Sequence, residues 1–460
     1  MHSDYNHYYA YQESPNKTFL KTKYLSEHPE KGKSILMGSS NGGYINANLI
    51  EPGTYNMKYN FGLLAIHLQN IKTMIKMGVP IKTLWIGIND YIIWKDPKDY
   101  ENSFERSLYR ADFREDMKTY LHYLFRKPDV LDWYLFVEHY VLRETDIISN
   151  PQPHLEAKRR EEKHLKTPTK WRAEIDAREP TLLHYDDTHY RIESALREIS
   201  ELKELAKKHH IKLVIFTYPT FFKSYLLYNQ FAIEEFKRKL SNIMPHYDFY
   251  ELNRDAFDGL KWQDTMHFSY SYGNYLIYSI KSGKNLVTKE NIEKHITSTY
   301  KIAKKSLLEY FNDHRKILPV HESILKKLTL VKNKKIYELK KSFYLLQANR
   351  NFEILQKKDT IEVKLKTKVS TINLPKLNTK KSIVVGHFNI TSSHTTLFRI
   401  YYKKSANGNY TERATFRKTL KRGKNNFNLF IPAEYIKWGL RVDFANTPGA
   451  YLVNKFEIIE

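Results

Sequence analysis

Cysteine is absent from all 460 residues of the chain. Without thiols the protein has no disulfide bond, no cysteine nucleophile and no thiolate metal site, and this absence is compatible with an oxidising or extracellular location. Long apolar runs are also missing. A run such as residues 213–216 suits a buried strand but is far shorter than the roughly 20 residues of a membrane helix. We therefore expect no membrane-spanning segment.

A secretion signal is lacking as well. Residues 1–5 show neither the apolar core nor the small-residue cleavage site of a signal peptide. The chain as it stands is expected to be cytosolic or to have lost an N-terminal segment. We find no internal repeat and no low-complexity tract.

Acidic residues are in deficit, with 51 Asp and Glu against 75 Lys and Arg, which gives a net charge of +24. This balance favours an anionic partner such as a nucleic acid, a membrane surface or an acidic polysaccharide. The basic residues are spread along the whole chain, as a simple compositional bias would also produce, and no nucleic-acid-binding motif accompanies them. We therefore predict no nucleic-acid partner.

Short β-type runs alternate with helical patterns in the first half of the chain, which predicts an α/β fold with a parallel sheet. A stretch at about 91–190 is too long for a simple connection and is predicted to be a helical insertion over the strand ends. The predicted strands cover 34–37, 83–88, 212–217 and 248–252, and the predicted amphipathic helices cover 63–77 and 192–209.

The pattern of apolar and polar residues changes after a helical segment around 291–312. From about residue 336, alternating apolar and polar runs recur with turn residues between them, a pattern typical of an antiparallel β-sandwich. A chain of this length is also too long for one core. We predict two domains, residues 1–320 and residues 336–460.

Polar residues follow two of the predicted strands. Ser39 and Ser40 follow the first strand, at the sheet edge where open α/β folds build their sites, and a serine N–H there can point at a developing oxyanion. Asn89 follows the strand at 83–88, and its amide is a neutral oxyanion donor. Taken alone, the serine segment is better explained as a common turn, and the Asn89 segment is equally well explained as a strand-terminating turn.

A carboxylate and an imidazole lie three residues apart at Asp264 and His267. The carboxylate can hold the Nδ1–H of the ring and leave Nε2 free to take a serine proton. The spacing is unspecific, because it recurs at residues 4 and 7 and at 186 and 189. Only the pair at 264 and 267 follows the last predicted strand and can return to the edge that carries Ser40.

Together, Gly38-Ser39-Ser40, Gly87-Ile88-Asn89-Asp90 and Asp264-x-x-His267 resemble the motif blocks of the SGNH (GDSL-like) hydrolase superfamily, in order and context. The resemblance covers roughly residues 19–286 and implies a three-layer α/β/α domain. It implies Ser40 as nucleophile, His267 as general base and Asp264 as its orienting partner. The implied oxyanion hole comprises the N–H of Ser40, Gly62 and Asn89.

Two positions depart from the SGNH pattern. The spacing around Gly62 is unusual for the glycine block, and Ser39 stands where Asp is usual, which leaves the choice between Ser39 and Ser40 open.

Within the superfamily, the Gly-Ser-Ser block and the sequence from His267 to Gly273 are similar to bacterial cell-envelope members, including alginate-type acetyltransferases and the D-alanyl-lipoteichoic acid protein. The sandwich is similar in pattern to carbohydrate-binding modules. The implied function is acyl transfer to, or ester hydrolysis on, an exported polysaccharide without cofactor or metal. The resemblance also implies an acyl donor supplied by a membrane-bound acyltransferase, and a location in the cell envelope, compatible with an N-terminal anchor absent here.

Aromatic residues make up 14% of the chain. Core packing explains most of them. Tyr91, Trp94 and Tyr270 lie close in sequence to the motifs and are predicted to be exposed for contact with a sugar.

Two other functions stay open. The chain could be a glycan-binding or assembly protein that keeps the fold without activity. It could also be a metal-dependent phosphoesterase that uses the cluster His184, Asp186, Asp187 and His189.

Overall fold

The computed structural model describes residues 16–59, 62–98, 108–125, 148–180, 189–328, 330, 334–339, 352–357, 360–367 and 371–460. The chain divides into two compact units. The first comprises residues 1–224 and 230–299, and the second comprises residues 225–229 and 300–460. No helix among the described residues is long and apolar enough to cross a membrane.

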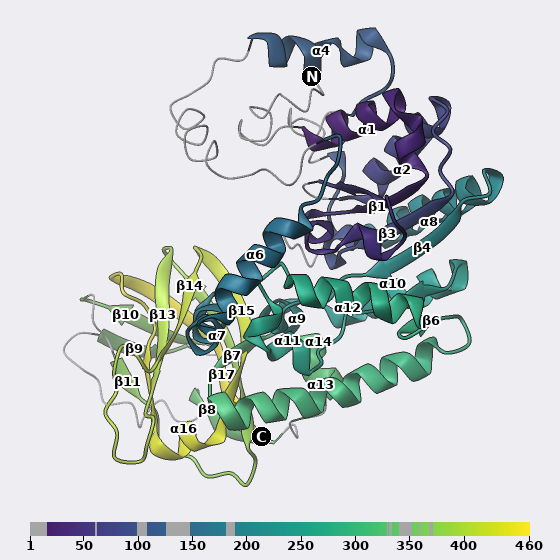
Figure 1. The fold of residues 1–460 in the computed structure, drawn as a ribbon. Coiled ribbons are helices and arrows are strands. Elements are labelled where there is room, and N and C mark those ends of the chain that lie inside the picture. The colour runs from purple at the N-terminus through teal and green to yellow at the C-terminus, as the bar shows by residue number, and fades with distance from the viewer. Residues whose placement is uncertain are drawn as a thin grey trace. The chain divides into compact units, whose positions relative to one another are not determined.

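The first unit is built on a six-stranded sheet of order β2-β1-β3-β4-β5-β6 (Figure 1). Its strands are β1 (Ser34–Gly38), β2 (Tyr55–Lys58), β3 (Thr83–Ile88), β4 (Lys212–Thr217), β5 (His246–Tyr247) and β6 (Leu286–Val287). All neighbours pair in parallel except β5 and β6, which are antiparallel. The predicted mostly parallel α/β architecture is confirmed, and the predicted strands at 83–88 and 212–217 coincide with β3 and β4.

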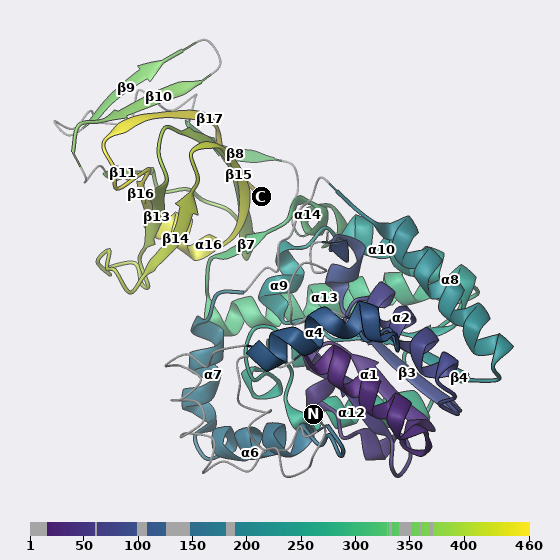
Figure 2. The same cartoon turned by 90° about the horizontal axis from the view of Figure 1, so that it is seen from above.

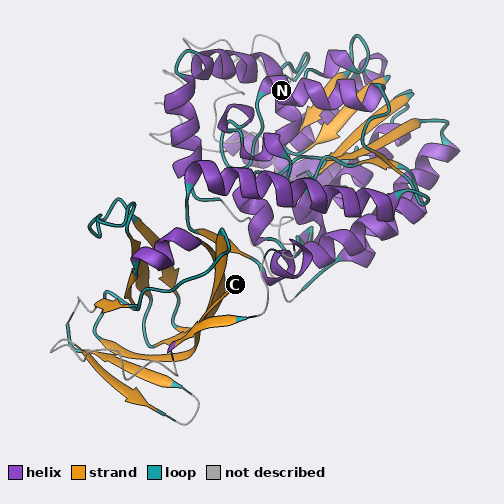
Figure 3. Ribbon diagram, turned by 90° about the horizontal axis from the view of Figure 1, so that it is seen from below, coloured by secondary structure: helices purple, strands orange, loops and turns teal. Residues whose placement is uncertain are grey.

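Helices pack beside this sheet (Figures 1 and 3). The amphipathic helices predicted at 63–77 and 192–209 form as α2 and α8, each within one residue of the expected ends. The described helices of this unit outside the segment between β3 and β4 are α1 (Lys17–Glu27), α2 (Leu64–Lys76), α8 (Ile192–Lys208), α9 (Phe222–Leu227), α10 (Gln230–Ile243), α11 (Arg254–Phe257), α12 (Tyr270–Lys281) and α13 (Ile292–His314), of which α9 and α13 continue into the second unit.

The segment between β3 and β4 contains the predicted helical insertion. Its described helices are α4 (Phe113–Phe125), α6 (His154–Leu165) and α7 (Pro168–Ala177). Helix α6 packs against α7, α12 and the short turn that follows β1. The insertion therefore lies at the end of the sheet where the candidate site was expected.

The prediction of a strand at 248–252 is wrong. Only residues 246–247 join the ladder as β5. Beyond them the N–H groups of Phe249 and Tyr250 donate to the side-chain Oγ1 of Thr217, the last residue of β4, at 2.8 and 3.2 Å, instead of to a backbone carbonyl of that strand. A side-chain acceptor thus replaces the ladder that the apolar pattern predicted.

The second unit carries antiparallel strands in two sheets (Figure 2). The larger sheet has the order β7-β15-β12-β17-β10-β9, with β8 also pairing with β17, and the smaller has the order β11-β16-β13-β14. The elements are β7 (Leu318–Val320), α14 (Glu322–Leu328), β8 (Lys335–Glu338), β9 (Phe352–Gln356), β10 (Ile361–Leu365), β11 (Thr371–Asn373), β12 (Ile383–Ser392), β13 (Thr396–Tyr402), β14 (Thr415–Leu420), β15 (Gly423–Pro432), α16 (Ala433–Trp438), β16 (Leu440–Asp443) and β17 (Gly449–Ile459).

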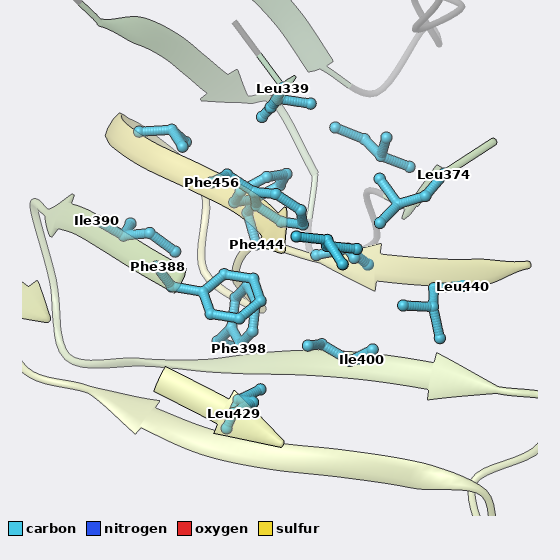
Figure 4. Close-up of a cluster of buried hydrophobic side chains, with 14 of the residues drawn as sticks. Leu339, Leu374, Phe388, Ile390, Phe398, Ile400, Leu429, Leu440, Phe444 and Phe456 are labelled. Atoms are coloured by element: carbon cyan, nitrogen blue, oxygen red, sulfur yellow. The ribbon is translucent and has the colours of Figure 1, made fainter. Parts of the chain in front are cut away.

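The core of this unit lies between the two sheets (Figure 4). The Phe388 ring centre lies 5.6 Å from that of Phe398 and 4.7 Å from that of Phe456, so aromatic side chains of both sheets interlock. The alternating pattern read from the sequence is confirmed as an antiparallel β-sandwich.

Candidate active site

The topology of the first unit defines a preferred place for a ligand. In the order β2-β1-β3, the chain leaves β1 toward β2 on one side and later returns to β3 on the other. The loops after β1 and β3 therefore diverge, and in open α/β sheets such a switch point forms a crevice outside the carboxyl ends of the strands. Ser40 follows β1 by two residues, and Asn89 follows β3 directly.

A continuous hydrogen-bond chain joins the three predicted catalytic residues. Ser40 Oγ lies 2.7 Å from His267 Nε2, and His267 Nδ1 lies 2.8 Å from Asp264 Oδ2. The second oxygen, Asp264 Oδ1, accepts the backbone N–H groups of Met266 and His267 at 2.7 and 2.9 Å. A hydroxyl, a base and an oriented carboxylate in this sequence are the arrangement that activates a serine nucleophile.

Hydrogen bonding separates the two adjacent serines. Ser39 is 2% exposed, and its Oγ accepts the N–H of Asn41 as the cap of the 3-10 turn η3 (Ser40–Tyr44). Ser40 instead points its hydroxyl at His267. The structure therefore places Ser39 in a capping position and Ser40 at the base.

The Asp264 carboxyl is held in its ionised form. Burial by itself would raise its pKa, but the hydrogen bond and charge of the His267 ring, together with the two backbone N–H groups, outweigh burial and bring the pKa below its ordinary value. An ionised Asp264 holds the Nδ1 proton of His267 and keeps Nε2 as the acceptor toward Ser40.

The loop that carries Asp264 and His267 is closed at its base. Trp262 and Phe268 form an antiparallel bridge, the N–H of Gln263 donates to the carbonyl of His267 at 2.8 Å, and the N–H of Ser269 donates to Lys261 at 2.7 Å. Because the loop is tied at both ends, the imidazole has little freedom to leave Ser40.

Tyr44 was not singled out in the sequence, yet it contacts the base. Its ring stacks on His267, with ring centres 5.2 Å apart and planes inclined by 27°. Burial, and next the charge of Asp264, raise the pKa of Tyr44 to about 12, so its hydroxyl stays neutral at physiological pH. The sequence offered one signal for Tyr44, its place four residues after Ser40.

Tyr218, which follows β4, explains two of the motif glycines. A Cβ atom placed on Gly38 or on Gly87 would lie 2.2 Å from the Tyr218 hydroxyl, which is too close for any other residue. Gly38 is the last residue of β1 and Gly87 the last but one of the neighbouring β3, so the same phenol packs across both. Tyr218 therefore supports the strand ends from which Ser40 and Asn89 emerge.

The predicted oxyanion donors lie at this edge too. A Cβ on Gly62 would lie 2.6 Å from the carbonyl carbon of Gly38 and from the nitrogen of Ser39, so its backbone packs directly against the turn that presents Ser40. The Oδ1 atom of Asn89 is buried and makes no hydrogen bond with any described residue. These positions are compatible with donors grouped around Ser40, while the roles of Gly62 and Asn89 stay predictions.

The insertion is tied to the catalytic loop from outside. Glu161 of α6 accepts the N–H and the hydroxyl of Ser271, at 2.9 and 2.5 Å, just after His267. Trp171 of α7 donates its Nε1–H to the carbonyl of Trp262 at 3.1 Å. Helices α6 and α7 therefore brace both ends of the segment that holds His267.

Comparison with known proteins adds little to this picture. No protein-family model and no curated protein matches the chain. The carbohydrate-binding module BiXyn10A CBM1 matches 28% of this chain over 99% of its own length, with 11% identity and a TM-score of 0.20. The C-terminal CBM6 of LamC from Zobellia galactanivorans matches 32% over 100% of its own length, with 11% identity and a TM-score of 0.14.

A third module, CBM6cm-2 of Cellvibrio mixtus lichenase 5A in complex with cellotriose, matches 28% of this chain over 98% of its own, with 12% identity and a TM-score of 0.13. Scores this low establish neither a shared fold nor a shared ligand. The SGNH resemblance rests on the residues alone.

The expected exposure of two aromatic residues is wrong. Tyr91 and Trp94 are only 5% and 8% exposed, because the 3-10 turn η5 (Asp90–Ile93) packs against α8 and α10 and turns both rings inward. Tyr270 is half-buried at the start of α12, with its ring 6.2 Å from that of His154. Its contact with substrate stays a prediction.

Most of the alternative metal cluster lies outside the part of the chain that the structure describes. His184, Asp186 and Asp187 lie outside the described residues, and His189 is exposed. Among the residues that the structure does describe, no group of three His, Asp or Glu side chains is arranged to hold a metal ion.

Proposed function

We propose that this chain is a serine-dependent acyl esterase or acyltransferase of the SGNH type, with a three-layer α/β/α catalytic domain. The observation that carries the proposal is the hydrogen-bond chain from Ser40 through His267 to Asp264 at the topological switch point. The motif order along the chain supports the same assignment.

In the proposed reaction, Ser40 Oγ attacks the carbonyl carbon of an acyl ester while His267 Nε2 takes the hydroxyl proton. The negative oxygen that forms is stabilised by the N–H groups of Ser40 and Gly62 and by the Asn89 amide. When the intermediate collapses, the ester C–O bond breaks and His267 returns the proton to the departing alcohol. Water or a sugar hydroxyl then attacks acyl-Ser40 in the same way.

The substrate proposed is an O-acyl, chiefly O-acetyl, group on a cell-envelope or exported polysaccharide. The net charge of +24 favours an acidic polymer, and the antiparallel sandwich is a scaffold that could hold a glycan. The proposed donor is an acyl group supplied by a membrane-bound acyltransferase, and the proposed location is the cell envelope.

A fluorophosphonate probe tests the nucleophile directly. We expect a covalent mass gain on the peptide that contains Ser40, abolished in Ser40→Ala and retained in Ser39→Ala, since Ser39 Oγ caps η3 instead of facing His267. Hydrolysis of p-nitrophenyl acetate should fall by about 10⁴-fold in Ser40→Ala. Unchanged turnover in Ser40→Ala would refute the proposal.

The same experiment separates the alternatives. Glycan binding without any labelling of Ser40 would favour a non-catalytic binding protein that keeps the fold. With an acetyl donor, mass spectrometry in the presence and absence of candidate oligosaccharides distinguishes transfer to sugar from transfer to water.

A further inference from the structure

The smaller sheet of the sandwich presents a charged outer face. In β13 and β16, Phe398, Ile400 and Val442 point into the core, so the residues that alternate with them point outward. These outward residues, with their counterpart on β14, form what we call the arginine face: Arg399, Tyr401, Arg417, Arg441 and Asp443.

The strand register makes this face electrostatically costly. Arg399 lies directly opposite Arg417 on β14, and like charges in that position destabilise a sheet. Two carboxylates offset part of the cost: Glu412 Oε2 lies 2.6 Å from Arg417 Nη2, and Asp443 Oδ2 lies 3.7 Å from Arg399 Nη1. Two of the three arginines thus have acidic partners.

Arg441 is held differently. Its guanidinium carbon lies 4.3 Å from the ring centre of Tyr401 and 5.0 Å from that of Tyr410. Its charge acts on the neighbouring Asp443, but its side chain makes no hydrogen bond or ion pair within 4 Å with any described residue, and its buried Nε has no partner there. The two rings hold the plane of the Arg441 guanidinium but leave its N–H groups without acceptors among the described residues.

The Tyr401 ring is itself fixed. Its hydroxyl donates to Glu412 Oε1 at 2.9 Å and accepts from Arg399 Nη1 at 3.4 Å. The cation–π platform under Arg441 is therefore anchored to both of its charged neighbours. A guanidinium oriented in this way, with free donors, suits bidentate binding of a planar carboxylate.

We propose that the arginine face binds an acidic glycan, and that the guanidinium of Arg441 binds a sugar carboxylate through two hydrogen bonds. The proposal rests on the proposed function for the choice of a glycan. The face itself also favours a sugar over a nucleic acid. The Tyr401 ring is 3% exposed and covered by Arg441, so it offers no base-stacking surface. The carboxylates of Asp443 and Glu412 can accept hydrogen bonds from the free hydroxyls of a sugar, which oligo-dT lacks along its chain.

The test uses the full chain carrying Ser40→Ala, so that acyl chemistry cannot alter the ligand. Binding of polygalacturonate, neutral dextran and oligo-dT is measured by biolayer interferometry at fixed salt. We expect Arg441→Gln to weaken polygalacturonate binding by about tenfold, the loss of one charge-assisted pair. Arg441→Lys keeps the charge but loses the planar guanidinium that can donate two parallel hydrogen bonds, and it should weaken binding by about threefold.

Arg422→Gln is the matched control, because Arg422 is exposed in the turn between β14 and β15 and is not one of the residues of the arginine face. We expect it to change binding by less than about twofold, the scale of a peripheral charge. Tyr410→Leu removes one of the two rings that contact Arg441 and should weaken polygalacturonate binding by about threefold, as the loss of a cation–π contact would. If Arg441→Gln fails to fold, this variant tests the proposal instead, and unchanged binding in Tyr410→Leu would then overturn it.

Equal losses in Arg441→Gln and Arg422→Gln would overturn the inference in favour of diffuse charge. Dextran binding as tight as polygalacturonate, or tighter binding of oligo-dT, would overturn it as well. Fluorophosphonate labelling of Ser40 in the unsubstituted chain tests the proposed function separately. Labelling without polygalacturonate binding refutes only the arginine face, and binding without labelling refutes only the proposed chemistry.

Discussion

Replacing Asp264 by asparagine tests the orienting role of the carboxylate. The amide oxygen of Asn can occupy the Oδ1 position and keep the two backbone hydrogen bonds from Met266 and His267. Its NH2 group then faces His267 Nδ1, which must become an acceptor, so the ring proton moves to Nε2 and faces Ser40. A protonated Nε2 cannot accept the serine proton.

We expect kcat for p-nitrophenyl acetate to fall by about 10²- to 10⁴-fold, equivalent to about 3 to 5 kcal/mol of activation free energy. The unfolding midpoint should change little, because the backbone hydrogen bonds remain. Asp258→Asn is the matched control: Asp258 lies upstream in the same region, caps Leu260 at 3.1 Å and pairs with Arg172. It should stay within about twofold of the parent, as exposed ion pairs contribute little.

The assay is run from pH 5 to 9. Because the pKa of Asp264 lies below its ordinary 3.8, the carboxylate is ionised throughout this range, and its orienting effect is lost only as the pH falls through that lowered pKa. Asp264→Asn should therefore reduce kcat at every pH in the range. Retention of a third or more of kcat, or an equal loss in Asp258→Asn, would refute the reasoning.

Two further predictions concern a brace of the candidate site and a buried charge network elsewhere in the first unit. Glu161→Gln weakens the acceptor for Ser271, so we expect a loss of about three- to tenfold in kcat/KM, in the range of one charged hydrogen bond, with the fold intact by circular dichroism; an unchanged kcat/KM would contradict it. Asp248 is fully buried between Lys237 Nζ at 2.6 Å and His295 Nε2 at 2.8 Å, and Asp248→Asn should lower the free energy of urea unfolding by about 3 to 5 kcal/mol. Burial acts to raise the pKa of Asp248, but the charges of Lys237 and His295 lower it strongly, so this stabilisation is fully present above the ordinary 3.8 and is lost progressively as the pH falls from there toward the lowered pKa. A loss under 1 kcal/mol in Asp248→Asn at neutral pH would show that the network contributes little.

Local pattern was a good guide wherever one face of an element meets a core. The periodicity of α2 and α8 and the alternation of β13 and β16 follow from burial on one side, which any sequence window reveals. Chain order then placed Ser40, Asn89 and His267 near one sheet edge, because parallel strands expose their carboxyl ends together. Closeness in sequence to a motif was a poor guide to exposure, however, because Tyr91 lies in η5 and its ring is buried.

Sequence by itself therefore determined the two architectures and the residue types at the strand ends, since these depend on short-range burial and on strand direction. Only the tertiary structure decided that Ser40 and not Ser39 meets the base, that Tyr44 stacks on His267, and that Tyr218 lies against Gly38 and Gly87. It alone also brought Glu161 to a residue 110 positions away. Such contacts depend on how separate elements pack, and no local pattern in the chain encodes that packing.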